Sequence, residues 1–260
     1  MKHTIYFVDA FAEKAFEGNP AGVCILDEPM DETMMQNIAA ENNLSETAFV
    51  VKNGENFSIR WFTPAIEVDL CGHATLASGY ILFNELVYEK DTIEMNSKSG
   101  ILKVSRQNDR ISLDFPTLEL TQVEVKEFHL QMFDKTAQEV YETIDDYLFV
   151  FESEEDIRNI KPDFSRLLDL DCRGVIVTAP GEKVDFVSRF FAPAVGIPED
   201  PVTGSAHTKL IPYWSRRLGK KELIAKQISK RGGTLYCKDK GDRVDIAGKA
   251  VLYLKGEINI

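Results

Sequence analysis

The strongest constraint on the fold is a segment that occurs twice in the chain. Residues 60–82 and residues 189–218 share an aromatic run, a proline and an alanine, an acidic loop, and small residues that lead into an apolar stretch. Arg60 matches Arg189 at an offset of 129 (189 minus 60), and the aromatic, proline and alanine positions that follow match at the same offset. A repeated segment indicates a repeated structural unit, so we expect two halves built on one plan.

Each copy predicts a strand, a loop and the start of a helix. The predicted helices begin at Gly72-His73-Ala74 and at Gly204-Ser205-Ala206. The first turn of a helix has backbone N–H groups without intrahelical partners and carries partial positive charge. Both helix starts are therefore candidate sites for a carboxylate or another anion, although the same residues also suit a simple helix cap.

Elsewhere the pattern favours short strands. Apolar and polar residues alternate at residues 110–115, as expected for a strand with one buried face. An amphipathic segment at residues 31–42 predicts a helix, and we expect another at residues 136–144. Pro212 lies inside the second repeated helix, where it should kink the helix or leave a backbone group unsatisfied.

Many short strands around one apolar helix in each half predict an α+β fold, with a curved, barrel-like sheet around a central helix. The composition turns charged and β-branched near residue 117. We therefore place the boundary between residues 1–116 and residues 117–260, and expect the last strand to return to the first half.

The composition excludes several classes of partner. A net charge of −12 makes nucleic acid an unsuitable partner, because an acidic surface repels phosphate. No apolar stretch approaches the ~20 residues of a membrane span, and the N-terminal segment lacks the pattern of a signal peptide. We therefore expect a cytoplasmic protein without a membrane partner.

The cysteines and histidines indicate no metal site. The cysteines are scattered without CxxC spacing, so we expect free thiols rather than disulfides or zinc ligands: Cys24, Cys71, Cys172 and Cys237. The four histidines are too dispersed to form a metal site evident from sequence. Neither a GxGxxG nor a Walker A pattern is present, so we expect no cofactor.

Glu46 is a candidate acid or base. It lies between the polar cluster that ends the helix at residues 31–42 and a predicted strand at residues 47–51, beside strongly apolar neighbours. Burial disfavours the charged form of a carboxylate and prepares such a group to exchange a proton. A solvated surface glutamate remains the alternative, since glutamate is rarely fully buried.

Several motifs together resemble the PhzF-type (phenazine biosynthesis-like) isomerases. They are VDAF at residues 8–11, GNPAGV at 18–23, NLSETAF at 43–49, DLCGHAT at 69–75, EDPVTGSAH at 199–207 and RGG at 231–233. The resemblance runs from the first strand almost to the C-terminus. It implies a diaminopimelate epimerase-like fold, in which two pseudo-symmetric halves hold the active site in the cleft between them.

The resemblance also implies an activity. The family's characterised member isomerises trans-2,3-dihydro-3-hydroxyanthranilate by moving a proton, without a metal or an organic cofactor. Glu46 matches the catalytic acid/base of that family, while His73, Asp200 and Ser205 match residues that bind substrate and assist proton transfer. Gly72 and Gly204 would let the backbone approach the carboxylate of a small substrate. The family often forms homodimers, which implies a homodimer here.

Three other functions remain open. Epimerases and racemases of this fold use one cysteine from each half, and hydroxyproline-type dehydratases use a Cys/Thr pair, which Cys71 and Thr203 resemble. A hydrolase built on Ser205 and His207 fits less well, because the surroundings are not G-x-S-x-G and the two side chains should point apart. The non-enzyme alternative is a small-molecule binding protein that retains the fold.

Overall fold

The computed structural model describes residues 2–260. The chain forms two compact units: unit 1 comprises Met1–Phe115 and Asp245–Ile260, and unit 2 comprises Pro116–Val244. Short strands outnumber helices in both, which confirms the predicted α+β class. Within residues 2–260, every helix is too short or too polar to cross a membrane.

Unit 1 is a strongly curved sheet around helix α2 (Gly72–Tyr80). Its neighbouring strands run in the order β18, β1, β2, β3, β4, β6, β7, β8, with β5 paired to β4. Their bounds are β1 (Lys2–Ala10), β2 (Asn19–Leu26), β3 (Glu46–Asn53), β4 (Asn56–Phe62), β5 (Glu67–Val68), β6 (Thr92–Ser97), β7 (Gly100–Gln107), β8 (Arg110–Pro116) and β18 (Ala250–Asn259). The β2–β3 and β4–β6 pairs are parallel, and the other pairs are antiparallel.

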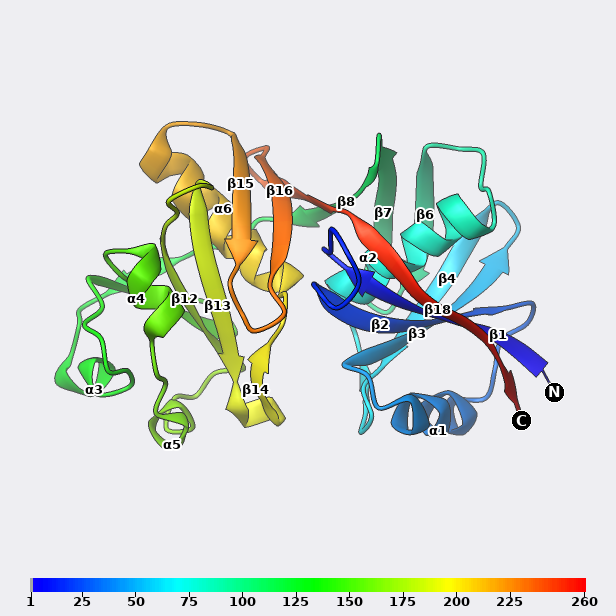
Figure 1. The fold of residues 1–260 in the computed structure, drawn as a ribbon, viewed down its shortest axis with the longest axis horizontal. Coiled ribbons are helices and arrows are strands. Elements are labelled where there is room, and N and C mark those ends of the chain that lie inside the picture. Colours follow the sequence, from blue (N-terminus) through cyan, green and yellow to red (C-terminus); the bar gives the residue numbers. More distant parts are fainter. Residues whose placement is uncertain (1) are drawn as a thin grey trace. The chain divides into compact units, whose positions relative to one another are not determined.

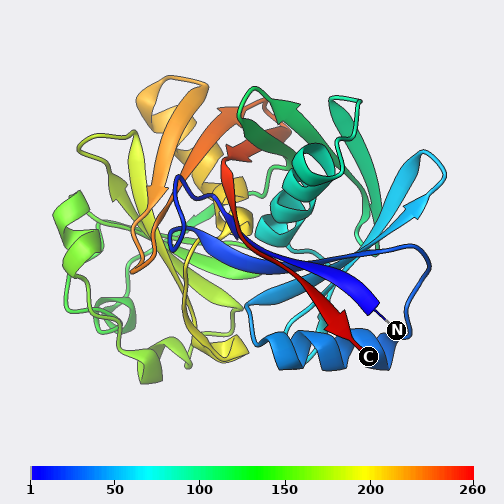
Figure 2. The ribbon, with the colours of Figure 1, turned by 45° about the vertical axis from the view of Figure 1, so that its right-hand side comes forward.

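Two helices cover opposite faces of the unit 1 sheet (Figures 1 and 2). Helix α1 (Glu32–Asn42) lies outside and packs its buried residues, including Met35 and Ile38, against Phe49 and its neighbours. Helix α2 lies inside, with every residue from His73 to Gly79 buried. A Cβ on Gly79 would come within 2.5 Å of the Val104 side chain, so glycine permits this close packing. A π-helical turn, η1 (Ile81–Glu85), extends α2.

Unit 2 repeats the plan around α6 (Gly204–Leu218). Its strand order is β9, β10, β11, β12, β13, β15, β16, with β14 paired to β13. The bounds are β9 (Thr121–Val123), β10 (Glu139–Glu142), β11 (Asp146–Val150), β12 (Gly174–Pro180), β13 (Phe186–Ala192), β14 (Ile197–Asp200), β15 (Glu222–Gln227) and β16 (Gly233–Asp239). Strand β17 (Arg243–Gly248) crosses the boundary to unit 1.

Short helices cover the outer face of unit 2. They are α3 (Glu127–Leu130), α4 (Glu154–Asn159), α5 (Phe164–Leu167) and the 3-10 turn η2 (Pro193–Val195). In Figure 1, α6 lies behind β13 and β15, while α4 lies in front of β12. Alternation along β12 explains this division: Val175 and Val177 pack with Ile157 of α4, whereas Thr178 accepts a hydrogen bond from Trp214 of α6.

The predicted repeat is present in the structure. In each unit, parallel and antiparallel pairs alternate in the same order, and β11 to β16 correspond to β2 to β7. An ion pair repeats as well: Arg60 Nε lies 2.7 Å from Glu67 Oε1, and Arg189 Nε lies 2.7 Å from Glu199 Oε1. The first pair connects β4 to β5, and the second connects β13 to β14. In each unit the short strand, β5 or β14, precedes the central helix, α2 or α6.

One local prediction was wrong. Residues 136–144 contain strand β10 rather than a helix, because β10 pairs with a strand on each side and buries Val140. Tertiary pairing here overrides the local helical pattern. Helix α6 continues through Pro212, and the Thr208 carbonyl that proline cannot serve accepts the N–H of Leu118 at 3.4 Å.

Candidate active site

Glu46 and His73 meet inside unit 1. Glu46 is the first residue of β3 and sits opposite Ala21 of β2, while His73 is the second residue of α2. His73 Nε2 lies 3.0 Å from Glu46 Oε2, and the two side chains are only 7% and 14% exposed. The strand and the helix both belong to the core, so they hold this pair in a fixed geometry.

Asn19 orients the other edge of the His73 ring. The Asn19 side-chain amide lies 3.3 Å from His73 Nδ1, and Asn19 is fully buried at the start of β2. An amide presents either its oxygen or its nitrogen, so Asn19 can partner Nδ1 in either tautomer. Nε2 is thereby the ring atom that faces Glu46.

Cys71 completes the cluster as the N-cap residue of α2. Its Sγ lies 3.5 Å from His73 Nδ1 and 3.9 Å from Nε2. Burial, assisted by the nearby Glu46 charge, raises the pKa of Cys71, so the thiol keeps its proton at neutral pH. This environment does not favour a resting thiolate.

The charge state of His73 is set by two opposing effects. Burial alone would lower its pKa, but the adjacent Cys71 sulfur and the Glu46 carboxylate raise the pKa of His73 well above 6.5. Since the Cys71 thiol is protonated near neutral pH, Glu46 is the partner that stabilises the imidazolium there. The cluster can therefore hold a proton between a carboxylate and an imidazole.

The other predicted site residues lie in unit 2. Asp200 ends β14, and its Oδ2 accepts a hydrogen bond of 2.5 Å from the hydroxyl of Thr203, the N-cap residue of α6. Gly204 and Ser205 form the first turn of α6, as predicted. The Ser205 hydroxyl accepts a hydrogen bond of 3.1 Å from Arg173 Nη1.

Sequence reasoning did not identify the residues that support this helix start. The buried Gln227 accepts from the Thr203 N–H at 2.9 Å and donates to the Asp200 carbonyl at 2.8 Å. It lies on the buried side of β15, where Leu223 and Ala225 are apolar, so a polar residue in that alternation was an available signal. No comparable sequence pattern marks Arg173.

A buried charge cluster lies behind Ser205. Arg173 binds both carboxylate oxygens of Asp146, at 3.0 and 2.6 Å. The fully buried Lys209 ammonium also contacts Asp146, and it lies 2.7 Å from Asp145 Oδ1. Two cations and two carboxylates balance, so this cluster stabilises the start of α6 without adding net positive charge.

His207 does not form a Ser-His pair with Ser205. It is fully buried, and its Nδ1 donates to the Thr203 carbonyl at 2.8 Å. Burial lowers the pKa of His207 to about 4, so the ring is neutral at physiological pH. The expectation that the two side chains diverge is confirmed, which argues against the hydrolase.

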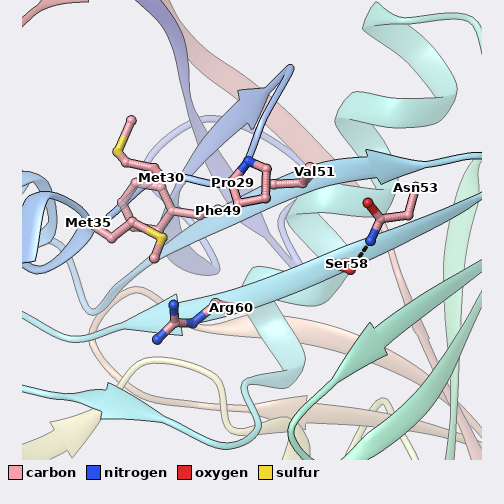
Figure 3. Close-up of a pocket in the computed structure, with 8 residues that line it drawn as sticks. All are labelled: Pro29, Met30, Met35, Phe49, Val51, Asn53, Ser58 and Arg60. Carbon is pink, nitrogen blue, oxygen red and sulfur yellow. Dashed lines mark hydrogen bonds between the residues drawn. The ribbon is translucent and has the colours of Figure 1, made fainter. Parts of the chain in front are cut away.

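A small apolar pocket lies elsewhere in unit 1 (Figure 3). Its volume is about 110 Å³, and its lining includes Met30, Met35, Phe49, Val51 and Arg60. Side chains alternate along β3, so Phe49 and Val51 face away from Glu46. The pocket is therefore separate from the Glu46–His73 cluster, and its lining contains no carboxylate, cysteine or histidine.

Comparisons with known proteins agree with the motifs. The family model for phenazine biosynthesis-like protein matches residues 8–256. An uncharacterized isomerase of Pseudomonas aeruginosa is 49% identical over the full length of both chains. A crystal structure of a PhzF-family phenazine biosynthesis protein from Enterococcus faecalis has a TM-score of 0.98 and 48% identity, and covers 100% of each chain.

A more distant structure is informative about the fold alone. A hydroxyproline epimerase from Agrobacterium vitis has a TM-score of 0.64 at 10% identity, over 99% of this chain and 92% of that one. The epimerase-like fold expected from the motifs is therefore confirmed.

Proposed function

The chain belongs to the phenazine biosynthesis-like protein family, and we propose that it is an isomerase that moves a proton within a small carboxylated substrate. The observation that carries this proposal is the contact of 3.0 Å between Glu46 Oε2 and His73 Nε2. Glu46 takes a proton from a substrate carbon and returns it to another position, with no covalent intermediate.

His73 serves as the partner of Glu46 in this mechanism. Its imidazolium stabilises the carboxylate before the reaction and the developing negative charge on the substrate after carbon loses its proton. Asn19 keeps Nε2 directed at Glu46 throughout. Close, fixed placement of the acid and base lowers the entropic cost of each proton transfer.

Substrate carboxylates are bound by helix starts in this proposal. The first turns of α2 and α6 have backbone N–H groups without intrahelical partners, next to His73 and Ser205 respectively. The Gln227 hydrogen bonds and the Arg173 contact hold the α6 turn in place. Asp200, hydrogen-bonded to Thr203, is a second group able to relay a proton.

The decisive experiment is proton NMR of the purified protein in heavy water. The probes are trans-2,3-dihydro-3-hydroxyanthranilate and a panel of small carboxylic acids, with Glu46→Gln as the variant. Isomerisation or exchange at carbon by the wild type alone supports the proposal, with an expected loss of about 10²- to 10⁴-fold in the variant. Equal activity of both proteins rules out Glu46 as the acid/base.

A second candidate function is an epimerase or dehydratase that uses Cys71 and Thr203. It is favoured by the contact between Cys71 and His73, since an imidazolium 3.5 Å from the sulfur would stabilise a thiolate formed during the reaction. If neither the wild type nor Glu46→Gln turns over any compound of the panel, but one of the compounds binds tightly to the wild type, the protein is better described as a small-molecule binding protein.

A further inference from the structure

Three side chains of different chemistry meet in unit 1. Glu46 Oε, Cys71 Sγ and a ring nitrogen of His73 all lie within 4.8 Å of one another. We propose that Glu46, Cys71 and His73 bind one zinc ion, and that the bound ion inhibits the isomerase. The inhibitory part rests on the proposed function, whereas the binding part does not.

The donor separations suit a tetrahedral ion. Typical zinc bond lengths place a sulfur and a nitrogen ligand about 3.5 Å apart, and a nitrogen and an oxygen ligand about 3.3 Å apart. Here Cys71 Sγ lies 3.9 Å from His73 Nε2, and Glu46 Oε2 lies 3.0 Å from the same nitrogen. These two separations differ from the expected ones by a few tenths of an ångström, and the Glu46 oxygen and Cys71 Sγ lie within 4.8 Å of each other.

The Glu46 carboxylate provides an independent indication of a missing partner. Its Oε2 is buried, yet within residues 2–260 it makes no hydrogen bond of good geometry, despite the short approach of His73. A buried oxygen without a well-directed donor is costly, and a cation on that side satisfies it.

The neighbouring residues complete the requirements of a metal site. Asn19 contacts His73 Nδ1, which leaves Nε2 as the ligating atom and supplies the outer hydrogen bond that metal-bound histidines require. Glu46 is 14% exposed, so an ion can enter from solvent at that edge.

The donor set selects the ion. A mixture of sulfur, imidazole and carboxylate is typical of zinc and unsuited to Mg²⁺ or Ca²⁺, which prefer oxygen ligands. Zinc binding releases two protons to solvent, one from the Cys71 thiol and one from Nε2 of the His73 imidazolium, because a ligating cysteine must be a thiolate and a ligating histidine must be neutral. The ion then occupies the lone pairs with which Glu46 and His73 exchange protons, so proton transfer to substrate stops.

The first test is zinc binding by the full chain after removal of metals with EDTA, measured by calorimetry with ZnCl₂. We expect one ion per chain with a dissociation constant of about 1 µM or lower. Cys71→Ser and Glu46→Gln should weaken binding at least about 100-fold. Cys172→Ser, which changes a cysteine of unit 2 that is not part of this cluster, should bind like the wild type.

Two further measurements keep the proposal falsifiable. Co²⁺ in place of Zn²⁺ should give a thiolate-to-metal charge-transfer band in the wild type that Cys71→Ser abolishes, and circular dichroism establishes that each variant is folded. Absence of zinc binding by the wild type, or equal affinity in folded Cys71→Ser, overturns the site.

Inhibition is tested separately. In the heavy-water assay, one equivalent of ZnCl₂ should stop turnover by the wild type and by Cys172→Ser, and EDTA should restore it. Undiminished turnover with zinc bound refutes inhibition. Zinc binding without any turnover on the panel counts against the proposed isomerase and leaves the metal site intact.

Discussion

Gly174 occupies the place in unit 2 that Glu46 occupies in unit 1. In each unit the next residue of the strand pairs with the equivalent phenylalanine of the neighbouring strand, Phe62 or Phe191. A Cβ on Gly174 would lie 2.2 Å from the Phe190 ring, so no side chain fits there. The duplicated plan therefore carries the carboxylate proposed as the acid/base in one copy only, which agrees with a mechanism that uses one base.

The first prediction separates the two candidate mechanisms. Cys71→Ser should retain proton exchange within about 10-fold of the wild type, because the proposed mechanism uses no thiol. The rate comes from the same NMR assay, with Cys172→Ser as the matched control. Loss of activity comparable to that expected for Glu46→Gln would favour the epimerase or dehydratase.

The second prediction concerns pH and stability. Since the pKa of His73 is raised in the folded state, its stabilising contribution is complete below the unfolded value of about 6.5 and is lost as pH rises through the folded value. The difference in unfolding free energy between wild type and His73→Gln should therefore shrink as pH rises from about 6 to about 8. Urea titrations at each pH measure it, and a difference that grows with pH would contradict the assignment.

The third prediction concerns the buried charges of unit 2. Lys209→Met leaves Asp146 with only Arg173, so we expect a loss of about 3 to 5 kcal/mol in unfolding free energy. The control is Lys238→Met, which breaks the exposed pair with Glu222 and should cost about 1 kcal/mol or less. Similar losses of unfolding free energy in both variants would show that breaking the buried cluster is no more destabilising than breaking an exposed ion pair.

The fourth prediction concerns the support of α6. Gln227→Leu removes the side-chain oxygen that accepts from the Thr203 N–H and the side-chain nitrogen that donates to the Asp200 carbonyl. We expect a loss of about 1 to 3 kcal/mol in stability and a rise in KM. Gln138→Leu, the same change at an exposed position, is the comparison, and an unchanged KM in Gln227→Leu would assign Gln227 a purely structural role.

The sequence predicted the parts of the site that depend on the repeat. The starts of α2 and α6 follow from small residues after a strand, and Glu46 follows from its position at a loop-to-strand junction. These positions depend on residues that are neighbours in the sequence, so the hydrophobic pattern along the chain predicts them. The resemblance to the PhzF motifs then suggested the proposed roles of His73, Asp200 and Ser205.

What the sequence missed depends on contacts between distant segments. Asn19 begins β2 and reaches His73, 54 positions further along the chain, which no local pattern predicts. Cys71 was weighed only as a thiol, and the histidines were judged too dispersed for a metal, whereas the fold brings Glu46, Cys71 and His73 together. Spacing along the chain carries no information on such clusters.

The pairing of β18 with β1 has a consequence for synthesis of the protein. Unit 2 lies wholly between the two segments of unit 1, so a ribosome completes unit 2 before it makes β18. Strand β1 must therefore wait with one edge unpaired while more than half of the chain is translated. The half that contains Glu46 is the first to emerge and the last to close.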